Sequence, residues 1–186
     1  MRPLKLVVAG PVAAGKTTFV RALSETPVVD TDVEATEDIG KLNTTVAFDF
    51  GTLTLDGIPL HLYGTPGQDR FDFMWELLCE GALGLVMLVS GDRPRDFAAA
   101  RNMLEFITTR YPVPYLLGVT RQDLPRVWEP DDVADYFDLP PSQVLGLNAT
   151  DPAACHDLLA TLLEQLDSSA SRLPDLSPLF PSQETP

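Results

Sequence analysis

The apolar positions of the chain fall into two patterns that alternate along its length. Short, nearly continuous apolar runs predict strands at 4–9, 45–55, 58–63, 82–90, 115–120 and 144–147. Apolar residues three or four positions apart predict helices at 16–26, 71–80, 94–110, 129–137 and 153–166. This alternation of strands and helices predicts an α/β fold with a mostly parallel sheet.

One connection and one polar stretch depart from this alternation. Asp56-Gly57 is a strong hairpin signal, so the strands at 45–55 and 58–63 are predicted to pair antiparallel. Residues 27–44 are rich in acidic side chains, with no basic residue before Lys41. This stretch is predicted to be a long mobile loop.

Length and composition indicate one globular domain. The chain has 186 residues, of which 45% are hydrophobic and 22% charged, enough for a substantial core. The net charge of −14 opposes binding to nucleic acid or anionic lipid, so neither is an expected partner. The predicted domain spans residues 1–167. Residues 168–186 are rich in Ser and Pro and are predicted to form a flexible tail, which either docks on a partner or packs lightly on the domain.

Two further features predict a cytoplasmic protein without a direct membrane anchor. Cys79 and Cys155 lie among apolar neighbours on predicted helices, which favours two reduced core thiols over a disulfide or a metal site. The first apolar run is too short for a signal peptide, no run is long enough to span a bilayer, and neither end carries a lipidation motif.

Residues 10–17 read Gly-Pro-Val-Ala-Ala-Gly-Lys-Thr and match the phosphate-binding loop of nucleotide-binding proteins. The loop follows a predicted buried strand and opens a predicted helix. This arrangement turns backbone N–H groups and the positive end of the helix toward an anion. Lys16 is predicted to reach the β- and γ-phosphates of a nucleoside triphosphate, and the Thr17 hydroxyl is predicted to bind Mg²⁺.

Two later segments are candidates for the γ-phosphate end of the same site. The backbone N–H of Gly67 could approach the γ-phosphate, and the Gln68 amide could orient the attacking water. The Thr45 hydroxyl could be a second ligand of Mg²⁺ when a γ-phosphate draws its loop in. The alternatives are a simple turn at 64–68 and threonines that merely begin a strand. The catalytic candidates are therefore Lys16, Gly67 and Gln68, and the candidate Mg²⁺ ligands are Thr17 and Thr45.

Two segments that follow the last strands are candidates for recognition of the base. The Asp123 carboxylate could accept hydrogen bonds from guanine N1–H and N2–H₂, a pair of donors that adenine lacks. The Arg121 side chain could lie across the purine face, and the Ala149 backbone N–H could meet guanine O6. The predicted nucleotide-binding residues are Val12, Ala13, Ala14, Gly15, Lys16, Thr17, Thr18, Thr45, Gly67, Thr120, Arg121, Asp123, Asn148, Ala149 and Thr150.

Taken in this order, the motifs resemble those of the Ras-superfamily small GTPases over nearly the whole domain. Ala-Ala-Gly-Lys-Thr-Thr at 13–18, Thr-Val-Ala-Phe at 45–48 and Gln-Asp-Leu-Pro at 122–125 are most similar to the Arf branch. Thr-Pro-Gly-Gln at 65–68 is instead similar to the bacterial Mgl-type polarity and gliding GTPases. The chain thus resembles a prokaryotic member that lies between these branches.

This resemblance implies a three-layer small GTPase fold, with a six-stranded sheet that contains one antiparallel strand. It implies a molecular switch that binds GTP and GDP with Mg²⁺ and hydrolyses GTP, with switch segments at 30–46 and 64–80. It also implies protein regulators and effectors, among them a dimeric roadblock-type activator.

Five positions depart from the family's pattern, and two of them lie in the base motif, where Thr120 and Arg121 replace the commoner Asn and Lys. The family usually has Asp where this chain has Gly64, and that Asp anchors the water shell of Mg²⁺, which Gly cannot do. Val12 stands where Ras-type proteins carry Gly, and Thr44 stands where Mgl-type proteins carry Arg. The chain thus has no evident source of the cation that stabilises the transition state, so slow intrinsic hydrolysis is expected.

Three hypotheses for the function stay open at this point. The first is a GTPase switch with slow turnover, and the second is a non-hydrolysing scaffold locked on its nucleotide. The third is a small-molecule kinase on the same loop. Such kinases generally need an Arg-rich lid, whereas four arginines here lie on or near the helix predicted at 94–110.

The helix predicted at 71–80 carries two apolar faces, which exceeds what packing of one surface helix needs. Phe71, Trp75 and Leu78 form a stripe that is assigned to the core. Phe73 and Leu77 lie on a second face, which is predicted to be covered or bared as the nucleotide changes. The alternative is that neighbouring loops always cover it.

Overall fold

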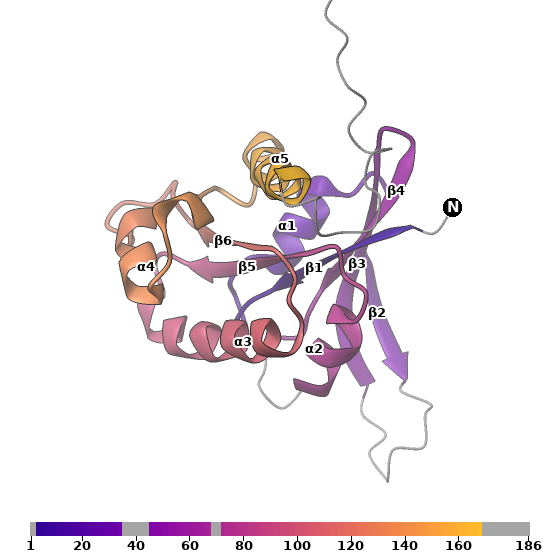
Figure 1. The fold of residues 1–186 in the computed structure, drawn as a ribbon, viewed down its shortest axis with the longest axis horizontal. Coiled ribbons are helices and arrows are strands. Elements are labelled where there is room, and N and C mark those ends of the chain that lie inside the picture. The colour runs from indigo at the N-terminus through magenta and orange to yellow at the C-terminus, as the bar shows by residue number, and fades with distance from the viewer. Residues whose placement is uncertain (1–2, 35–44, 68–71, 169–186) are drawn as a thin grey trace, which may run out of the picture.

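The computed structural model describes residues 3–34, 45–67 and 72–168 (Figure 1). Within these residues, one sheet has its strands hydrogen-bonded in the order β2-β3-β4-β1-β5-β6-β7. The strands are β1 (Leu4–Ala9), β2 (Val29–Glu34), β3 (Thr45–Leu55), β4 (Ile58–Gly64), β5 (Gly84–Ser90), β6 (Tyr115–Thr120) and β7 (Val144–Gly146). The α-helices are α1 (Lys16–Leu23), α2 (Asp72–Cys79), α3 (Phe97–Arg110), α4 (Pro130–Phe137) and α5 (Pro152–Ser168).

The directions of the strands confirm the predicted fold class. β4, β1, β5, β6 and β7 run parallel to one another, and β3 pairs antiparallel with both of its neighbours, β2 and β4. β3 and β4 form the predicted hairpin, in which Leu55 pairs with Ile58 across the Asp56-Gly57 turn. The expected mostly parallel sheet with one antiparallel strand is therefore present.

One part of the predicted organisation is wrong. Residues 29–34 were expected in a loop, but they pair with β3 as the edge strand β2. The physical reason lies in their pattern, because Val29, Thr31 and Val33 alternate with acidic residues at the period of a strand. The sheet consequently has seven strands within the described residues. The remainder of the predicted loop, at 35–44, lies outside the described residues.

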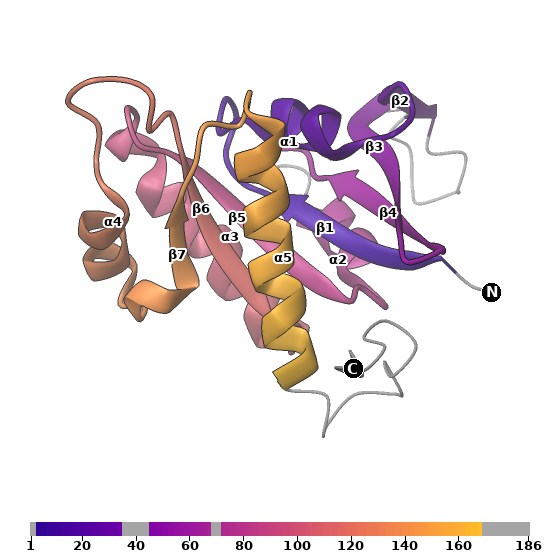
Figure 2. The ribbon, with the colours of Figure 1, turned by 90° about the horizontal axis from the view of Figure 1, so that it is seen from above.

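Helices cover both faces of the sheet in three layers (Figures 1 and 2). α1 and α5 pack on one face, where Phe19 and Leu158 are part of the core. α2, α3 and α4 pack on the other face, around Trp75 and Ile107. All seven residues of β5 are buried, because the strand has neighbours on both sides and helices on both faces. No helix of the described part is both long and apolar enough to cross a membrane.

The domain boundary predicted at 167 falls at the end of α5, which continues to Ser168. The predicted tail beyond this helix lies outside the described residues. Its separation from the domain therefore stays a prediction.

The ends of the parallel strands bring three of the predicted motifs to one edge of the sheet. Val8 of β1 is in register with Gly64 of β4, and Ser90 of β5 is in register with Thr120 of β6. The segments that follow β1, β4 and β6 therefore meet at the same edge. Ligands of open α/β sheets bind at such an edge.

α2 carries its apolar side chains as the sequence predicts. Trp75 and Leu78 are buried, whereas Leu77 is 62% exposed. The predictions for the side chains of Phe71 and Phe73 fall outside what the structure describes. Leu77 is therefore the part of the second face that can be placed, and it is open to solvent.

The two cysteines are buried thiols on opposite faces of the sheet. Cys79 is the last residue of α2 and Cys155 lies in α5, and the two belong to separate core clusters. They therefore cannot bond to each other, as the sequence predicts.

Burial raises the pKa of both thiols, Cys79 and Cys155, to about 11. Because the thiolate is the reactive form, we expect neither cysteine of the native protein to react readily with iodoacetamide at pH 8. Both should react once the chain is unfolded in urea. Mass spectrometry of the labelled protein measures this, and rapid labelling of either residue in the native state would contradict the burial described here.

Candidate nucleotide-binding site

The loop at 10–15 joins the end of β1 to the start of α1. The buried amine of Lys16, the first residue of α1, reaches back to this loop. α1 begins at Lys16, directly after Gly15, so the free N–H groups of its first turn point toward the loop. Lys16 is 8% exposed, and its Nζ donates hydrogen bonds to the carbonyl oxygens of Gly10 and Pro11, both at 2.7 Å. The predicted strand, loop and helix are therefore present at this edge.

The amine of Lys16 is held in a partly unfavourable environment. Burial lowers its pKa to about 8, while the nearby Asp49 carboxylate acts in the opposite direction. A buried cation is stabilised by an anion brought into contact with it. The loop is therefore suited to receive a negatively charged ligand such as a phosphate.

A cavity of about 280 Å³, named the phosphate cavity below, lies in front of this loop. Three elements form it: the loop with the start of α1, the middle of β3 and the end of β4. Its lining residues are Val12, Ala13, Lys16, Thr17, Phe48, Asp49, Gly64, Thr65 and Gly67. The structure thus brings five of the residues predicted for phosphate binding together with four that the sequence analysis did not assign to it.

The far side of this phosphate cavity fits a divalent cation. The Thr17 hydroxyl donates a hydrogen bond to Asp49 Oδ2 at 2.7 Å. A hydroxyl and a carboxylate are oxygen groups that suit Mg²⁺, either as ligands or as partners of the water that the ion retains. The buried hydroxyl of Thr65 has no hydrogen-bond partner among the described residues. No cluster of three His, Cys, Asp or Glu occurs in the described part, so phosphate oxygens and water would complete the coordination.

Gly67 lies directly against the phosphate loop. A Cβ atom added at this position would come within 2.5 Å of the Val12 backbone nitrogen and 2.9 Å of Lys16 Nζ. Only glycine allows this approach of the two backbones. One residue earlier, the carbonyl oxygen of Pro66 accepts a hydrogen bond from Trp75 Nε1 at 3.1 Å, which connects the segment to α2.

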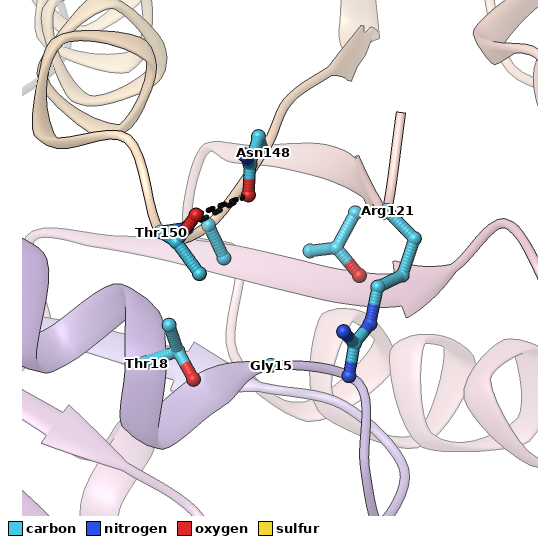
Figure 3. A pocket seen from close by; sticks show the side chains of 7 residues that line it. Gly15, Thr18, Arg121, Asn148 and Thr150 are labelled. Carbon is cyan, nitrogen blue, oxygen red and sulfur yellow. Dashed lines mark hydrogen bonds between the residues drawn. The ribbon is translucent and has the colours of Figure 1, made fainter. Parts of the chain in front are cut away.

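A second, smaller pocket lies on the other side of the phosphate loop (Figure 3). It is named the base pocket below, because the residues predicted to recognise the base line it. Its lining residues are Gly15, Thr18, Thr120, Arg121, Asn148, Ala149 and Thr150, all of them predicted nucleotide-binding residues. Its volume is about 40 Å³, room for one or a few water molecules, so a purine requires the walls to move apart. Arg121 is exposed and reaches toward the loop beside Gly15 (Figure 3), which makes it the wall that can move most freely.

Thr120 joins this base pocket to the phosphate loop. Its hydroxyl is buried, 2.9 Å from the Ala14 carbonyl oxygen and 3.2 Å from the Val89 carbonyl oxygen. The single hydroxyl proton is donated to one of these acceptors at a time. The contact holds the end of β6 against the loop through the backbone of Ala14, whose side chain is buried.

The loops around the base pocket are held by local hydrogen bonds. Asn148 Oδ1 accepts hydrogen bonds from the Thr150 backbone N–H and hydroxyl, at 3.0 and 2.8 Å. Gln122 Nε2 donates to the Trp128 carbonyl oxygen at 3.0 Å. Asp123 is exposed and makes no hydrogen bond or ion pair with the described residues. Its carboxylate is consequently free to accept hydrogen bonds from a ligand.

Not every predicted site residue is brought to the two pockets, because Ala14 and Asp123 line neither of them and Thr45 lies away from Thr17. The Thr45 backbone begins β3, where it pairs with Glu34 of β2. It is four residues from Asp49, about 13 Å along a strand, so Thr45 and Thr17 would need a rearrangement of β2 and β3 to share one ion. Gln68 lies outside the described residues.

Comparison with solved structures identifies the class of fold. The chain is similar to the Arl6 BBS3 small GTPase from Trypanosoma brucei, solved with the nucleotide analogue GppNp, with a TM-score of 0.70. The match covers 90% of this chain and 99% of that one, at 14% sequence identity. The chain therefore has the small GTPase fold, as its motifs predict.

Comparison of sequences identifies the family. Residues 28–173 match the family described as conserved hypothetical ATP binding protein, and the chain belongs to this family. The chain is also 38% identical over 125 residues to an uncharacterized protein of Methanocaldococcus jannaschii, a match that covers 65% of this chain and 71% of that protein. With the loop at 10–17, which precedes the matched residues, these findings define a nucleotide-binding P-loop protein.

The contact between Thr120 and Ala14 gives a direct test of the site. In Thr120→Val, a buried carbonyl would lose its donor, which costs about 1–3 kcal/mol. We expect a lower melting temperature and weaker nucleotide binding, both measured by thermal unfolding with and without nucleotide. Thr120→Ser keeps the hydroxyl and should restore both.

A matched control is Thr161→Val, because the Thr161 hydroxyl also donates to a carbonyl oxygen, that of Asp157 on α5. This variant should leave nucleotide binding unchanged. Equal nucleotide affinity in Thr120→Val and the parent protein would show that the contact does not support the site.

Proposed function

We propose that the protein is a guanine-nucleotide switch, which binds GTP and GDP with Mg²⁺ and slowly hydrolyses GTP. The observation that carries this proposal is that one loop forms part of the wall of both pockets. The phosphate cavity and the base pocket share the loop at 10–15, and the contact of Thr120 with Ala14 holds them together. A nucleotide laid across the loop would place its phosphates on Lys16 and its base between Arg121 and Asn148.

At the phosphate end, the proposed roles follow from the groups at hand. Lys16 would exchange its two carbonyl partners for phosphate oxygens, and the Gly67 backbone N–H would face the γ-phosphate. Thr17 would hold Mg²⁺, which neutralises charge on the phosphates when it is bound. We keep Gln68 as the residue that orients the attacking water, and Thr45 as a ligand gained when β2 and β3 rearrange.

At the base end, we propose that the Asp123 carboxylate selects guanine. Its lack of partners in the described residues leaves it able to accept from N1–H and N2–H₂ together. Arg121 would stack on the purine, and the Ala149 backbone N–H would meet O6. The description of the family names ATP as its ligand. The choice of base is therefore the part of this proposal that most needs measurement.

The proposed switch acts through α2. The hydrogen bond between Trp75 and Pro66 connects the residues that face the γ-phosphate to this helix, and Leu77 on its outer side is exposed. A shift of Gly67 on nucleotide exchange would thus move an apolar surface that regulators and effectors can contact. A roadblock-type activator would be one such partner, and a cytoplasmic location would suit it.

A second candidate, a scaffold locked on its nucleotide, is favoured by one observation. Among the described residues that line the phosphate cavity, Lys16 is the only cation. Without a second positive group, stabilisation of the transition state depends on a partner.

The kinase hypothesis receives less support. Arg93 and Arg101 are engaged in ion pairs with Asp96 and Asp138 away from the cavity, so neither forms a lid over phosphates.

Thermal unfolding is measured with GTP, GDP and ATP, each with and without Mg²⁺. It tests together which base is preferred, how many phosphates are needed and whether the metal is required. We expect GTP and GDP to stabilise the protein by about 4 kcal/mol at a thousandfold excess over the dissociation constant, and ATP to have little effect. Stabilisation by ATP alone would contradict the guanine assignment. Phosphate release from bound GTP in a single turnover then separates a slow GTPase from the locked scaffold.

The base assignment has a specific variant. In Asp123→Asn, guanine N1–H loses its acceptor, so we expect about 10- to 100-fold weaker GTP binding. Xanthine nucleotides, which carry a carbonyl at position 2, should bind better than to the parent protein. Asp135→Asn, an exposed carboxylate on α4, is the control and should change neither affinity. Unchanged GTP affinity in Asp123→Asn would count against the assignment.

A further inference from the structure

Gly64 stands where the small GTPases that the motifs resemble usually have the Asp of their Mg²⁺ site. A carboxylate, that of Asp49, lies directly opposite Gly64 on the neighbouring strand β3. In the β3–β4 pairing, Asp49 is in register with Gly64. Asp49 is 9% exposed, and it lines the phosphate cavity together with Thr17 and Thr65. The sheet therefore brings a carboxylate to this corner from β3 instead of β4.

Asp49 occupies space that a side chain at position 64 would need. A Cβ atom built on Gly64 would lie 3.0 Å from Asp49 Cβ and 2.9 Å from Asp49 Oδ2. Cβ atoms of directly opposed residues in antiparallel strands are ordinarily about 4.5–5.5 Å apart. Two carboxylates here would clash and repel each other. The aspartate at 49 can therefore occupy this corner only because position 64 is a glycine.

The surroundings of Asp49 suit a metal ion better than a purely structural role. Among the described residues, the carboxylate of Asp49 accepts one side-chain hydrogen bond, from the Thr17 hydroxyl, which is the group expected to bind Mg²⁺. The hydroxyl of Thr65, the residue after Gly64, is buried without a partner in the described part of the chain. Two groups at one corner are thereby left able to bond to an ion or to the water around it.

We propose that Asp49 provides the carboxylate of the Mg²⁺ site, in place of the missing Asp at position 64, and that Gly64 makes room for it. This inference rests on the proposed binding of a nucleotide with Mg²⁺ in the same cavity. In this role the Asp49 carboxylate would hold the ion through hydrogen bonds from the water that Mg²⁺ retains.

The charge of Asp49 gives this role a signature that a structural role lacks. Without metal, the carboxylate repels the phosphates of a bound nucleotide. With Mg²⁺ bound, the same carboxylate stabilises the ion. Removal of the charge should therefore weaken the effect of Mg²⁺ on nucleotide binding and, at the same time, leave metal-free binding unchanged or stronger.

Release of a fluorescent GDP derivative from the full chain, followed in EDTA and across a series of Mg²⁺ concentrations, tests the proposal. In the parent protein, Mg²⁺ should slow release. In Asp49→Asn, the Mg²⁺ concentration that gives half of this effect should rise about 10- to 100-fold, while release in EDTA is no faster. The amide oxygen still accepts from Thr17, so the variant should fold. Asp135→Asn is the control for loss of one negative charge and should behave as the parent.

The exchanged pair Asp49→Gly with Gly64→Asp supplies a second, independent test. It moves the carboxylate to β4 and removes the clash, so it should bring the Mg²⁺ requirement back near the parent value. An unchanged Mg²⁺ response in Asp49→Asn, or a folded exchanged variant that is no better than Asp49→Asn, would overturn the proposal. If the parent protein itself binds no GDP in EDTA or in Mg²⁺, the proposed function fails instead.

Discussion

The buried amine of Lys16 is the constraint on which the rest of the site depends. The amine is removed from water, its partners are the carbonyl oxygens of its own loop, and burial lowers its pKa to about 8. Such a group is costly unless an anion compensates it. Asp49 compensates it in part, because its carboxylate acts on the pKa in the opposite direction. A phosphate chain accompanied by a divalent cation would satisfy both groups, since the anion would contact Lys16 and water bound to the cation would donate hydrogen bonds to Asp49.

The loop at 10–15 also connects the environment of Lys16 to the base pocket and to the surface helix α2. Thr120 connects the loop to the end of β6, so the base pocket and the phosphate cavity share one edge of the sheet. On the opposite side, Gly67 lies against the loop, and Trp75 donates to Pro66, so α2 is connected to the phosphate position. Both connections are single hydrogen bonds or close backbone contacts. A net contribution of about 1 kcal/mol for one such hydrogen bond is small enough for ligand binding to outweigh it.

Much of the fold and part of the site can be predicted from the sequence, for identifiable reasons. Buried parallel strands have continuous apolar runs, so β5 and β6 stand out, and the loop at 10–17 has a spacing that few other structures use. β2 was missed because its acidic residues suggested a loop, although Val29, Thr31 and Val33 alternate as in a strand. Asp49 was missed because its partner lies on another strand; counting outward from the hairpin at Asp56-Gly57 would have placed it opposite Gly64. The unpartnered hydroxyl of Thr65 has no signal in the sequence, since it depends on packing alone.

The central claim is that a nucleotide lies across the loop at 10–15, with its phosphates on Lys16 and its base between the ends of β6 and β7. Two-dimensional amide NMR of the labelled protein, titrated with GDP and Mg²⁺, tests this claim most directly. The account predicts that the largest shifts fall on residues 10–18, 120–123 and 148–150, and that ADP fails to reproduce the shifts at 120–123. Shifts confined to other parts of the sheet, or equal shifts with both nucleotides at 120–123, would contradict it.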